Sequence, residues 1–528
     1  MKALISNILI LLGMLLLDTY NIEPLLARDN VITIYCNKKI GEVNDKVFGN
    51  NFIAYDPATY ENFNGEYYGY SDYGAGIWDP KTKMPVKEVM DLAKESGMSI
   101  IRFPGGCGTH RYEWERAIGD ERGHFLYGID EFLKTCEEIG AEAVITLSYF
   151  NDCEHEAADM AEYLTSPDNG VNPNGGIDWA KERARNGHSS PYSNVKYFEI
   201  GNEVWHGDHR SIQAVSPEEY GRRYLKYYEA IKTVNPDIKI GVTLYENDWD
   251  QKVLGLIKDK LDFGIVHVYP SPQVSMPNLQ LMNAKDIFKA SLGVSIFESE
   301  AYFHKVSELL KNVSGKDIPL AFTEYNGGFV QDEPVPYRHC LGTALINAEL
   351  LRIFMKPENN IIMANYWQFC NSYWGMVWTQ EDYMKHDYKQ HIKYLKRPNQ
   401  YVYELYNKHF GPELIPAEVS CGSYRMKGFS VPYLSVNASK DTDKSKVYIV
   451  VINKNMEKPE KAVVSLKDFS SSLKGDAWVL SGLSVDAVNE KDPENVKVTN
   501  RDISLQGDSF EFIFEPHSLT AIEIERRP

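Results

Sequence analysis

The chain has 528 residues, of which 43% are hydrophobic and 12% aromatic, and its formal net charge is −18 at pH 7. This length exceeds that of most single compact domains, so we expect one large domain and one smaller one. The acidic balance argues against nucleic acid and anionic membrane surfaces as partners, because a phosphate-binding face needs clustered Lys and Arg.

Residues 1–27 have the features of a signal peptide. Lys2 supplies the positive start, and the apolar segment ALISNILILLGMLLL (Ala3 to Leu17) follows it. The segment is too short, and too polar in its first third, for a membrane span. We therefore expect export to the periplasm or the medium, with no membrane span after removal of the signal.

The cysteine pattern excludes a disulfide scaffold and a zinc module. Seven cysteines are scattered over the chain, and no CxxC pair or His/Cys cluster has zinc-ligand spacing. The nearest approach to a metal site is HGDHR (His206 to Arg210), which we interpret as structural or as lying at the edge of a substrate site. We expect no metal and no cofactor.

Between residues 46 and 411, short β-rich apolar runs alternate with segments of helical period, as in a parallel sheet built from βα units. The predicted strands are 46–52, 99–106, 143–150, 196–203, 239–245, 263–269, 320–326 and 361–369. The predicted helices are 85–96, 127–139, 155–164, 217–234, 249–259, 297–310, 342–355 and 397–409. Eight such pairs predict a (β/α)8 TIM barrel, a fold of roughly 200 to over 400 residues.

Two further observations favour the barrel over an open doubly wound sheet. An open sheet of that class would have a Gly-rich phosphate turn after its first strand. FPGGCG (Phe103 to Gly108) contains glycines but lacks the GxGxxG spacing. Ser216 and Pro217 also provide an N-cap and a first-position proline for one predicted helix, and Gly140 provides a stop for another.

After residue 411 the pattern changes to strand-like alternation, with segments such as KVYIVVINK, SFEFIFEP and SLTAIEIE. Residues 412–528 are therefore predicted to form an antiparallel β-sandwich domain. Residues 28–45 contain the strand-like NVITIYC (Asn30 to Cys36), which we expect to join that sandwich. No linker rich in Pro, Gly or Ser separates the two domains, which favours a rigid pair.

Polar side chains follow several predicted barrel strands, at the end of the barrel where active sites of this fold form. Glu203 ends the fourth strand and Glu324 ends the seventh. Other strand ends supply Arg102, Asn151, Asp152, His267, Tyr269 and Gln368. The alternative for each Glu is a structural role, as a strand cap or in a surface pair with Lys. Two carboxylates on strands four and seven, with aromatic neighbours, favour a shared site.

Two carboxylates in one cleft suit the hydrolysis of a glycosidic bond. One carboxyl must be protonated to assist departure of the leaving oxygen, and the other must be ionised to meet the cationic sugar carbon. We expect Arg102 and Tyr269 to hold Glu324 ionised by charge and hydrogen bonding. We expect Trp205 to keep Glu203 protonated by desolvation.

The residues at these strand ends resemble a known family. The resemblance rests on IRFPGG…YEWERAIGD (Ile101 to Asp120), KYFEIGNEVW, VHVY, FTEYN, ANYWQ and the closing PHSLTAIEI (Pro516 to Ile524). In this order they are similar to glycoside hydrolase family 51, the α-L-arabinofuranosidases, over most of the chain. The resemblance implies a retaining double-displacement mechanism on a barrel of clan A. It also implies polysaccharide or oligosaccharide substrates, and homo-oligomers, which family members often form.

Position by position, the resemblance implies Glu203 as acid/base and Glu324 as nucleophile. Asn202 is expected to contact the sugar 2-hydroxyl, and Tyr269 and Arg102 to support the nucleophile. The residues assigned to substrate binding are Asn202, Tyr269, His267, Arg102, Gln368 and Cys107.

Two positions depart from the family pattern. Cys107 stands where the family usually has Asn, and Ala54 aligns with its sugar-binding Glu, with Asn50, Asn51 or Asp56 as substitutes. These departures keep three hypotheses open. The first is an α-L-arabinofuranosidase. The second is a related retaining enzyme, such as a xylosidase, another furanosidase or an endo-β-glucanase. The third is a glycan-binding protein on a retired enzyme scaffold.

Overall fold

The computed structural model describes residues 30–52, 77–79, 82–120, 127–207, 213–245, 247–270, 282–328, 334–371, 373–379, 394–469, 473–505 and 507–526. The predicted signal segment and Ala54 and Asp56 lie outside these residues. A search of the described helices for a bilayer-spanning segment finds none with the necessary length and hydropathy.

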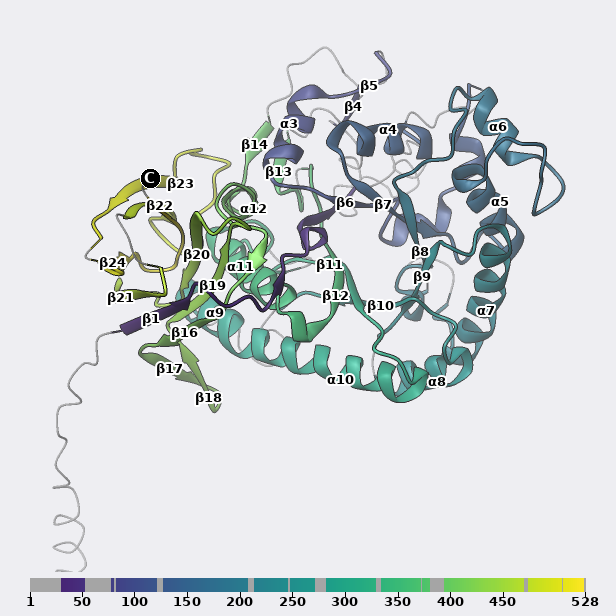
Figure 1. Cartoon of the computed structure of the whole chain (residues 1–528). Helices are drawn as coiled ribbons and strands as arrows, with labels where there is room; N and C mark the ends of the chain where they lie inside the picture. The colour runs from purple at the N-terminus through teal and green to yellow at the C-terminus, as the bar shows by residue number, and fades with distance from the viewer. Residues whose placement is uncertain are drawn as a thin grey trace, which may run out of the picture.

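Eight parallel strands close into a barrel, which confirms the predicted fold (Figure 1). In chain order they are β3 (Gly49–Asn51), β6 (Ile100–Phe103), β7 (Glu142–Leu147), β8 (Val195–Ile200), β9 (Lys239–Thr243), β10 (Phe263–Val268), β11 (Leu320–Tyr325) and β12 (Ile361–Tyr366). Each strand pairs in parallel with the next, and β12 closes the ring on β3. All eight overlap the strands predicted from the alternating pattern.

Helices follow the barrel strands where the sequence predicts them. They are α3 (Lys87–Glu95), α4 (Ile129–Ile139), α5 (Glu154–Thr165), α7 (Pro217–Val234), α8 (Asn247–Ile257), α10 (Ile296–Ser314), α11 (Leu341–Phe354) and α12 (Pro398–Lys408). The Ser216 hydroxyl caps α7 by accepting the Glu219 N–H, and Gly140 ends α4 at φ 87°. Among the described residues, two helices lie outside the predicted set, α6 (Trp179–Arg185) and α9 (Ala284–Ala290). Helix α9 continues through a π-helical turn (Ser291–Ser295) into α10.

Apolar side chains fill the barrel below the strand ends. This buried floor consists of Ile100, Val144, Tyr197, Phe263, Ile265, Ala321 and Met363. Gly241 makes room for it, because a Cβ there would lie 2.2 Å from the Phe263 ring. Burial of each large side chain contributes about 1.5–3 kcal/mol to folding. Because side chains alternate along a strand, residues two or four positions beyond a floor residue also point inward, above the floor.

The second domain is a sandwich of two sheets, with strand orders β16-β1-β21-β24 and β2-β15-β19-β20-β25-β22-β23. Its strands are β1 (Asn30–Tyr35), β2 (Gly41–Glu42), β15 (Glu413–Leu414), β16 (Ala417–Ser420), β19 (Leu434–Lys440), β20 (Lys446–Asn453), β21 (Glu460–Lys467), β22 (Leu473–Gly482), β23 (Val496–Ile503), β24 (Ser509–Phe514) and β25 (Ser518–Arg526). The pairing is antiparallel, as predicted, except that β1 runs parallel to β21. Both β1 and β2 precede the barrel, so segments from both sides of the barrel in the sequence build the sandwich.

The remaining elements in the described part of the chain are short. Hairpins form between β4 (Trp78–Asp79) and β5 (Met84–Pro85), between β13 (Val377–Thr379) and β14 (Tyr394–Lys396), and between β17 (Ser423–Met426) and β18 (Phe429–Pro432). Single 3-10 turns are η1 (Asp45–Phe48), η3 (Cys107–Arg111), η4 (Trp114–Ala117), η5 (Val204–His206) and η8 (Pro357–Asn359). Of these, η3 and η5 closely follow barrel strands, and predicted site residues lie in them or beside them.

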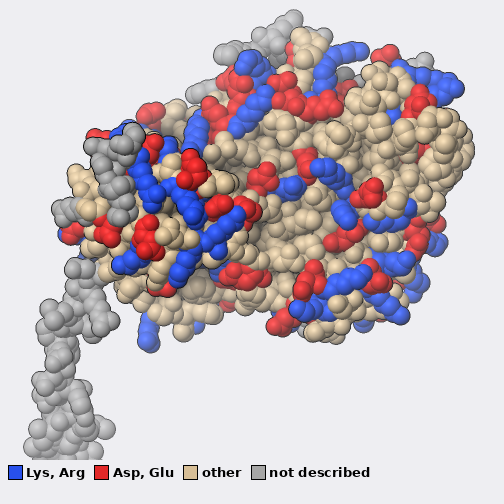
Figure 2. Space-filling view, viewed as in Figure 1, with Lys and Arg blue, Asp and Glu red and all other residues tan. Residues whose placement is uncertain are grey.

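Figure 2 shows the charge on one face of the molecule, where Lys and Arg are intermixed with Asp and Glu over the sandwich. On this face the positive charges do not form the continuous stripe that tracks a phosphate backbone. The two signs of charge are therefore interspersed on this surface rather than separated into blocks.

A buried ion pair joins the two domains. Helices α11 and α12 contact β19, β20, β22, β23 and β25. In this interface Lys454 Nζ lies 3.1 Å from one oxygen of Glu349, and Arg352 Nε donates to the other at 2.8 Å. Burial disfavours the Glu349 anion, but Arg352 and Lys454 outweigh it and lower the pKa of Glu349 to about 2.

We expect Lys454→Met to destabilise the protein. Removing one partner of a buried ion pair costs about 3–5 kcal/mol, because the other charge stays buried. Calorimetry should show a clearly lower thermal midpoint for this variant. Lys311→Met, which breaks an exposed pair with Asp317, is the matched control and should leave the midpoint nearly unchanged. Equal midpoints for the two variants would contradict the structural role of Lys454.

Candidate active site

The C-terminal ends of the barrel strands bring the predicted site residues together. Arg102 on β6 and His267 on β10 lie two positions beyond the floor residues Ile100 and Ile265, so their side chains point inward above the floor. His267 is also in register with Glu324 on the neighbouring strand β11. Glu203 lies three residues after β8 and completes the group.

Glu203, His267 and Glu324 form a compact group. One carboxylate oxygen from each Glu and one ring nitrogen of the His all lie within 4.8 Å of one another. His267 Nδ1 lies 2.7 Å from Glu203 Oε1 and 3.6 Å from Glu324 Oε2, and its Nε2 lies 3.1 Å from the Thr323 hydroxyl. The imidazole therefore bridges the two carboxylates.

Local backbone geometry places Glu203. Its φ of 43° and ψ of 40° lie in the left-handed region, which costs a non-glycine residue of order 1–3 kcal/mol. This turn ends the extended chain of β8 and starts η5, so the carboxyl group leaves the strand and faces His267. Gly201, at φ 77°, precedes it, and a Cβ there would lie 2.8 Å from Val204.

Arg102 holds the Glu324 carboxylate by a hydrogen bond. Its Nη1 donates to Glu324 Oε1 at 2.8 Å, and its Nη2 donates to Asn202 Oδ1 at 2.7 Å. Its Nε donates to Glu199 Oε1 at 2.5 Å, and Nη1 also reaches Asn51 Oδ1 at 3.3 Å. The side chain is 1% exposed, so one buried guanidinium positions four groups.

The two carboxyl groups have different surroundings. The Glu324 side chain is 3% exposed, against 19% for Glu203. Burial raises the pKa of Glu324, while His267, Arg102 and the Tyr269 hydroxyl, which donates to Oε2 at 2.7 Å, act in the opposite direction. The sequence predicts donors that hold Glu324 ionised. The structure places the donors there but adds a burial cost that they must overcome.

His267 takes part in the same balance. Burial disfavours its cation, but the negative charges of Glu324 and Glu203 outweigh burial, and the pKa of His267 rises above its ordinary value. Groups this close exchange protons as one unit, so their macroscopic pKa values belong to the set. A proton on His267 balances negative charge between the two carboxylates.

The Trp205 ring lies among other aromatic rings. It stacks on Tyr245 at 4.7 Å and packs edge-on against Trp249 at 5.9 Å. His267 supplies a 2.7 Å contact to Glu203, and the desolvation of Glu203 by Trp205 stays a prediction.

Asn202 and Cys107 are neighbours. Asn202 Nδ2 donates to Cys107 Sγ at 3.5 Å, and the Asn202 carbonyl lies 2.7 Å from His110 Nε2. Burial, together with the charges of Glu203 and Glu324, raises the pKa of the Cys107 thiol well above its usual value. The thiol therefore stays protonated, and the thiolate that alkylating reagents need is disfavoured.

Gln368 follows β12 and is 3% exposed. Its side-chain oxygen accepts a hydrogen bond from Asn371, while its amide nitrogen is buried without a hydrogen-bond partner among the described residues. An unsatisfied buried donor costs about 1–3 kcal/mol, so this amide is suited to an incoming acceptor. Beside it, Gly106 admits the Trp367 ring, which a Cβ would meet at 2.4 Å.

Asn151 and Asp152 line a separate small cleft of about 250 Å³ with Glu113, Trp114, Glu115, Arg116 and Glu156. Burial, with the nearby Glu156, Glu115 and Glu113, raises the pKa of Asp152 to about 7. The structure therefore gives these two strand-end residues surroundings of their own, away from the group formed by Glu203, His267 and Glu324.

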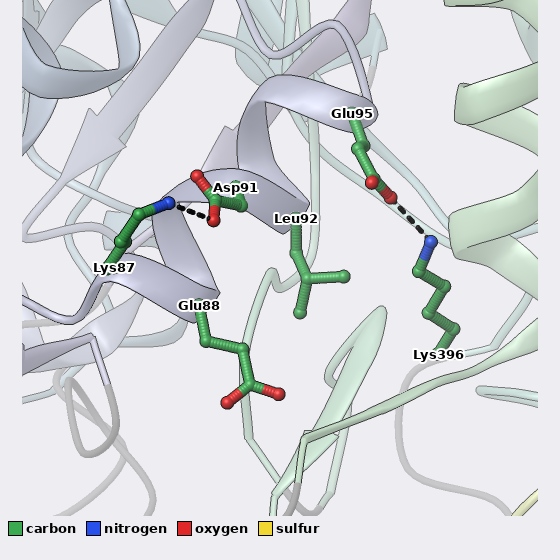
Figure 3. Close-up of a pocket in the computed structure, with 6 residues that line it drawn as sticks. All are labelled: Lys87, Glu88, Asp91, Leu92, Glu95 and Lys396. Atoms are coloured by element: carbon green, nitrogen blue, oxygen red, sulfur yellow. Dashed lines mark hydrogen bonds and ion pairs between the residues drawn. The ribbon is translucent and has the colours of Figure 1, made fainter.

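A larger hollow of about 560 Å³ lies outside the barrel, on α3 (Figure 3). Four of its five charged side chains pair with one another, Lys87 with Asp91 and Lys396 with Glu95, each at 2.5 Å. None of the predicted site residues lines it. Its volume alone does not make it a site for hydrolysis of a glycosidic bond.

Two members of the site, Glu199 and Thr146, are absent from the residues predicted from the sequence. Glu199 is 0% exposed. Its carboxylate accepts one hydrogen bond from Arg102 and another from the Thr146 hydroxyl at 2.8 Å. The signal was present in the sequence, because Glu199 lies two residues after the inward-facing Tyr197. A search of strand ends misses Glu199 because the residue stands inside a strand rather than at its end.

The close group of Glu203, His267 and Glu324 also has the spacing of metal ligands. The surroundings do not suit a cation. The Arg102 guanidinium is already 2.8 Å from Glu324, and Tyr269 occupies the other oxygen of that carboxylate. The group therefore fits acid–base and nucleophilic chemistry better than metal binding.

Comparisons with known proteins agree with this geometry. Residues 92–286 match the "Alpha-L-arabinofuranosidase 1 domain" family model, and residues 324–518 match the "Alpha-L-arabinofuranosidase C-terminal domain" model. A "Probable alpha-L-arabinofuranosidase C" of Aspergillus clavatus is 24% identical over 93% of this chain and 96% of its own length. An "Intracellular exo-alpha-L-arabinofuranosidase" of Bacteroides ovatus is 23% identical over 76% of this chain and 80% of its own length.

Solved structures share the fold. The arabinose complex of α-L-arabinofuranosidase from Thermotoga maritima has a TM-score of 0.77 at 22% identity, covering 94% of this chain and 100% of its own. The family 51 α-L-arabinofuranosidase AbfB of Bifidobacterium longum has a TM-score of 0.78 at 19% identity, with the same coverage. The sequence matches and the paired carboxylates lead to the same conclusion: the chain belongs to the arabinofuranosidase-like glycosidases of glycoside hydrolase family 51.

Proposed function

We propose that this protein is a retaining α-L-arabinofuranosidase that removes arabinofuranosyl groups from polysaccharide or oligosaccharide by double displacement. The observation that carries the proposal is the short distance between Glu203 and Glu324, which have carboxylate oxygens within 4.8 Å of each other. Retaining glycosidases hold their carboxyl groups about 5–5.5 Å apart, whereas inverting enzymes need roughly 6.5–9.5 Å to admit a water. The names of the matched relatives support the choice of sugar.

In the first step Glu324 attacks the anomeric carbon, while Glu203 gives its proton to the departing oxygen. This forms a glycosyl ester on Glu324 and releases the leaving group as an alcohol. In the second step Glu203, now a carboxylate, takes a proton from water, and the water oxygen displaces Glu324. His267, in contact with both carboxylates, is placed to balance the charge as the proton leaves and returns.

Further residues are suited to holding the sugar. Arg102 fixes Asn202 through its side-chain oxygen and so leaves the Asn202 amide directed toward Cys107. The unpartnered amide of Gln368 is a second donor for a sugar hydroxyl. We propose that these amides orient the furanose, because hydrogen bonds that strengthen in the transition state lower the barrier.

The second candidate is a retaining enzyme of other specificity, favoured by Cys107 at the position where the family usually has Asn. A panel of 4-nitrophenyl glycosides decides between them. We expect release from the α-L-arabinofuranoside at a kcat/KM well above that for the xylopyranoside and glucopyranoside. A higher kcat/KM on another glycoside would contradict the arabinofuranosidase assignment and favour a retaining enzyme for that other sugar. If the protein released nitrophenol from none of these glycosides but still bound glycans, it would be a glycan-binding protein rather than an enzyme.

Two variants test the roles on the best substrate of that panel. Glu324→Ala should lose nearly all activity, because no covalent intermediate forms. Glu203→Ala should keep the first step for the good nitrophenolate leaving group and lose roughly 10²–10⁴-fold in the second. Added azide should then restore its turnover and yield a glycosyl azide. Azide rescue of Glu324→Ala in place of Glu203→Ala would exchange the two roles.

The pH dependence of kcat/KM tests the donors around Glu324. The nucleophile must be ionised, so activity falls as the pH drops through its pKa. Tyr269→Phe removes a donor that lowers that pKa, so the acidic limb should move to higher pH. The Tyr227→Phe variant is the control, since Tyr227 is a buried tyrosine whose hydroxyl bonds main-chain carbonyls of Ser148 and Asp152. An unmoved acidic limb in Tyr269→Phe would remove Tyr269 from this role.

A further inference from the structure

An aromatic pair lies beside the proposed acid/base residue and takes no part in the steps above. The rings of Trp205 and Tyr245 stack with centroids 4.7 Å apart and planes inclined by 13°. Trp205 follows Glu203 by two residues in η5, and Tyr245 lies just after β9. The pair therefore stands at the same end of the barrel as the two carboxylates.

The Tyr245 ring is held in place and yet open to solvent. The residue is 42% exposed, an unusual fraction for a large aromatic residue of the barrel. Its backbone N–H donates to Asp250 Oδ1 at 2.7 Å, and its carbonyl accepts the Tyr302 hydroxyl at 2.9 Å. With the main chain fixed on both sides, the ring loses little freedom when a ligand covers it.

The Trp205 ring is supported from below. Trp249, which is buried, packs edge-on against it at 5.9 Å. The indole N–H of Trp205 is itself buried without a hydrogen-bond partner among the described residues. The indole is therefore fixed by packing rather than by hydrogen bonds, and the stack presents a rigid aromatic surface.

The position of the pair relative to Glu203 identifies what would reach it. His206 Nε2 lies 4.0 Å from Glu203 Oε2, and the His206 ring centroid lies 6.1 Å from that of Tyr245. The His206 imidazole thus lies between the Glu203 carboxyl group and the stacked rings. In the proposed mechanism the proton of Glu203 goes to the oxygen of the leaving group, so the ring that carries this oxygen lies on the Glu203 side of the site, where Tyr245 and Trp205 also lie.

We propose that Trp205 and Tyr245 form a stacking platform for a neutral pyranose ring of the leaving-group glycan. An aromatic face is electron-rich and attracts the partly positive C–H groups that line one face of a pyranose. The platform gives the enzyme a preference for arabinofuranosyl groups attached to a pyranose backbone over those attached to a small alcohol. This inference rests on the proposed function, because it takes Glu203 as the residue that protonates the leaving oxygen.

The test compares two substrates that share the sugar and differ in the leaving group. One is a xylo-oligosaccharide that carries a single α-L-arabinofuranosyl group, and the other is methyl α-L-arabinofuranoside. In Tyr245→Ala the ratio of kcat/KM for the first to that for the second should fall at least roughly fivefold. Tyr245→Phe keeps the aromatic face and should preserve most of the wild-type ratio.

The controls separate this inference from the proposed function. Failure of the wild type on both substrates would count against the arabinofuranosidase itself. A wild type active on both, with an unchanged ratio in Tyr245→Ala, would overturn the platform, as would an equal loss on both substrates. Phe429→Ala removes another exposed aromatic ring, on β18, and should leave the ratio unchanged. Should Tyr245→Ala fail to fold, Tyr245→Leu keeps an apolar cover on Trp205 without an aromatic face, and the same fall is expected.

Discussion

The buried guanidinium of Arg102 is the interaction on which the site depends. It touches Glu199, Glu324, Asn202 and Asn51, and thereby ties strands β3, β6, β8 and β11 together above the apolar floor. A buried cation is tolerated only when its donors are used and its charge is balanced. Two buried carboxylates provide the balance, so the charge that stabilises this end of the barrel also orients the proposed nucleophile.

Burial and hydrogen bonding act in opposite directions on the proposed nucleophile. Glu324 is more buried than Glu203, and burial raises its pKa. Arg102, Tyr269 and His267 oppose that tendency through charge and through hydrogen-bond donation. In the proposed attack this carboxylate would lose little solvation, because fixed protein dipoles have replaced the water around it.

The sequence predicts the fold well and the site in part, and the reasons are physical. Strand and helix periods are local properties, so all eight βα pairs are found near their predicted positions. The parallel pairing of β1 with β21 depends on which distant strand is adjacent, and no local pattern reports that. Strand ends identify Glu203, Glu324, Arg102, His267 and Tyr269. Glu199 and the stacking of Trp205 depend on inward direction and tertiary contact, which a strand-end rule does not capture.

The sandwich supports the barrel as well as covering it. Main-chain carbonyls in its 484–490 segment accept hydrogen bonds from the backbone N–H groups of Leu341 and Gly342 at the start of α11. The Glu490 carboxylate accepts a hydrogen bond from Arg397 Nε at 2.7 Å. Arg397 in turn donates to the Gly375 carbonyl at 2.9 Å, in the loop that follows Gln368. The sandwich domain therefore braces a loop at the mouth of the barrel.

In the proposed mechanism one carboxylate attacks while its close neighbour transfers the proton, and the configuration of a trapped product tests this division of roles most directly. The protein is supplied with 4-nitrophenyl α-L-arabinofuranoside in water containing methanol, and the methyl glycoside formed is examined by proton NMR. Methyl α-L-arabinofuranoside is the expected product, because two displacements restore the starting configuration. The β anomer as the first product would show a single displacement and would contradict the roles given to Glu203 and Glu324.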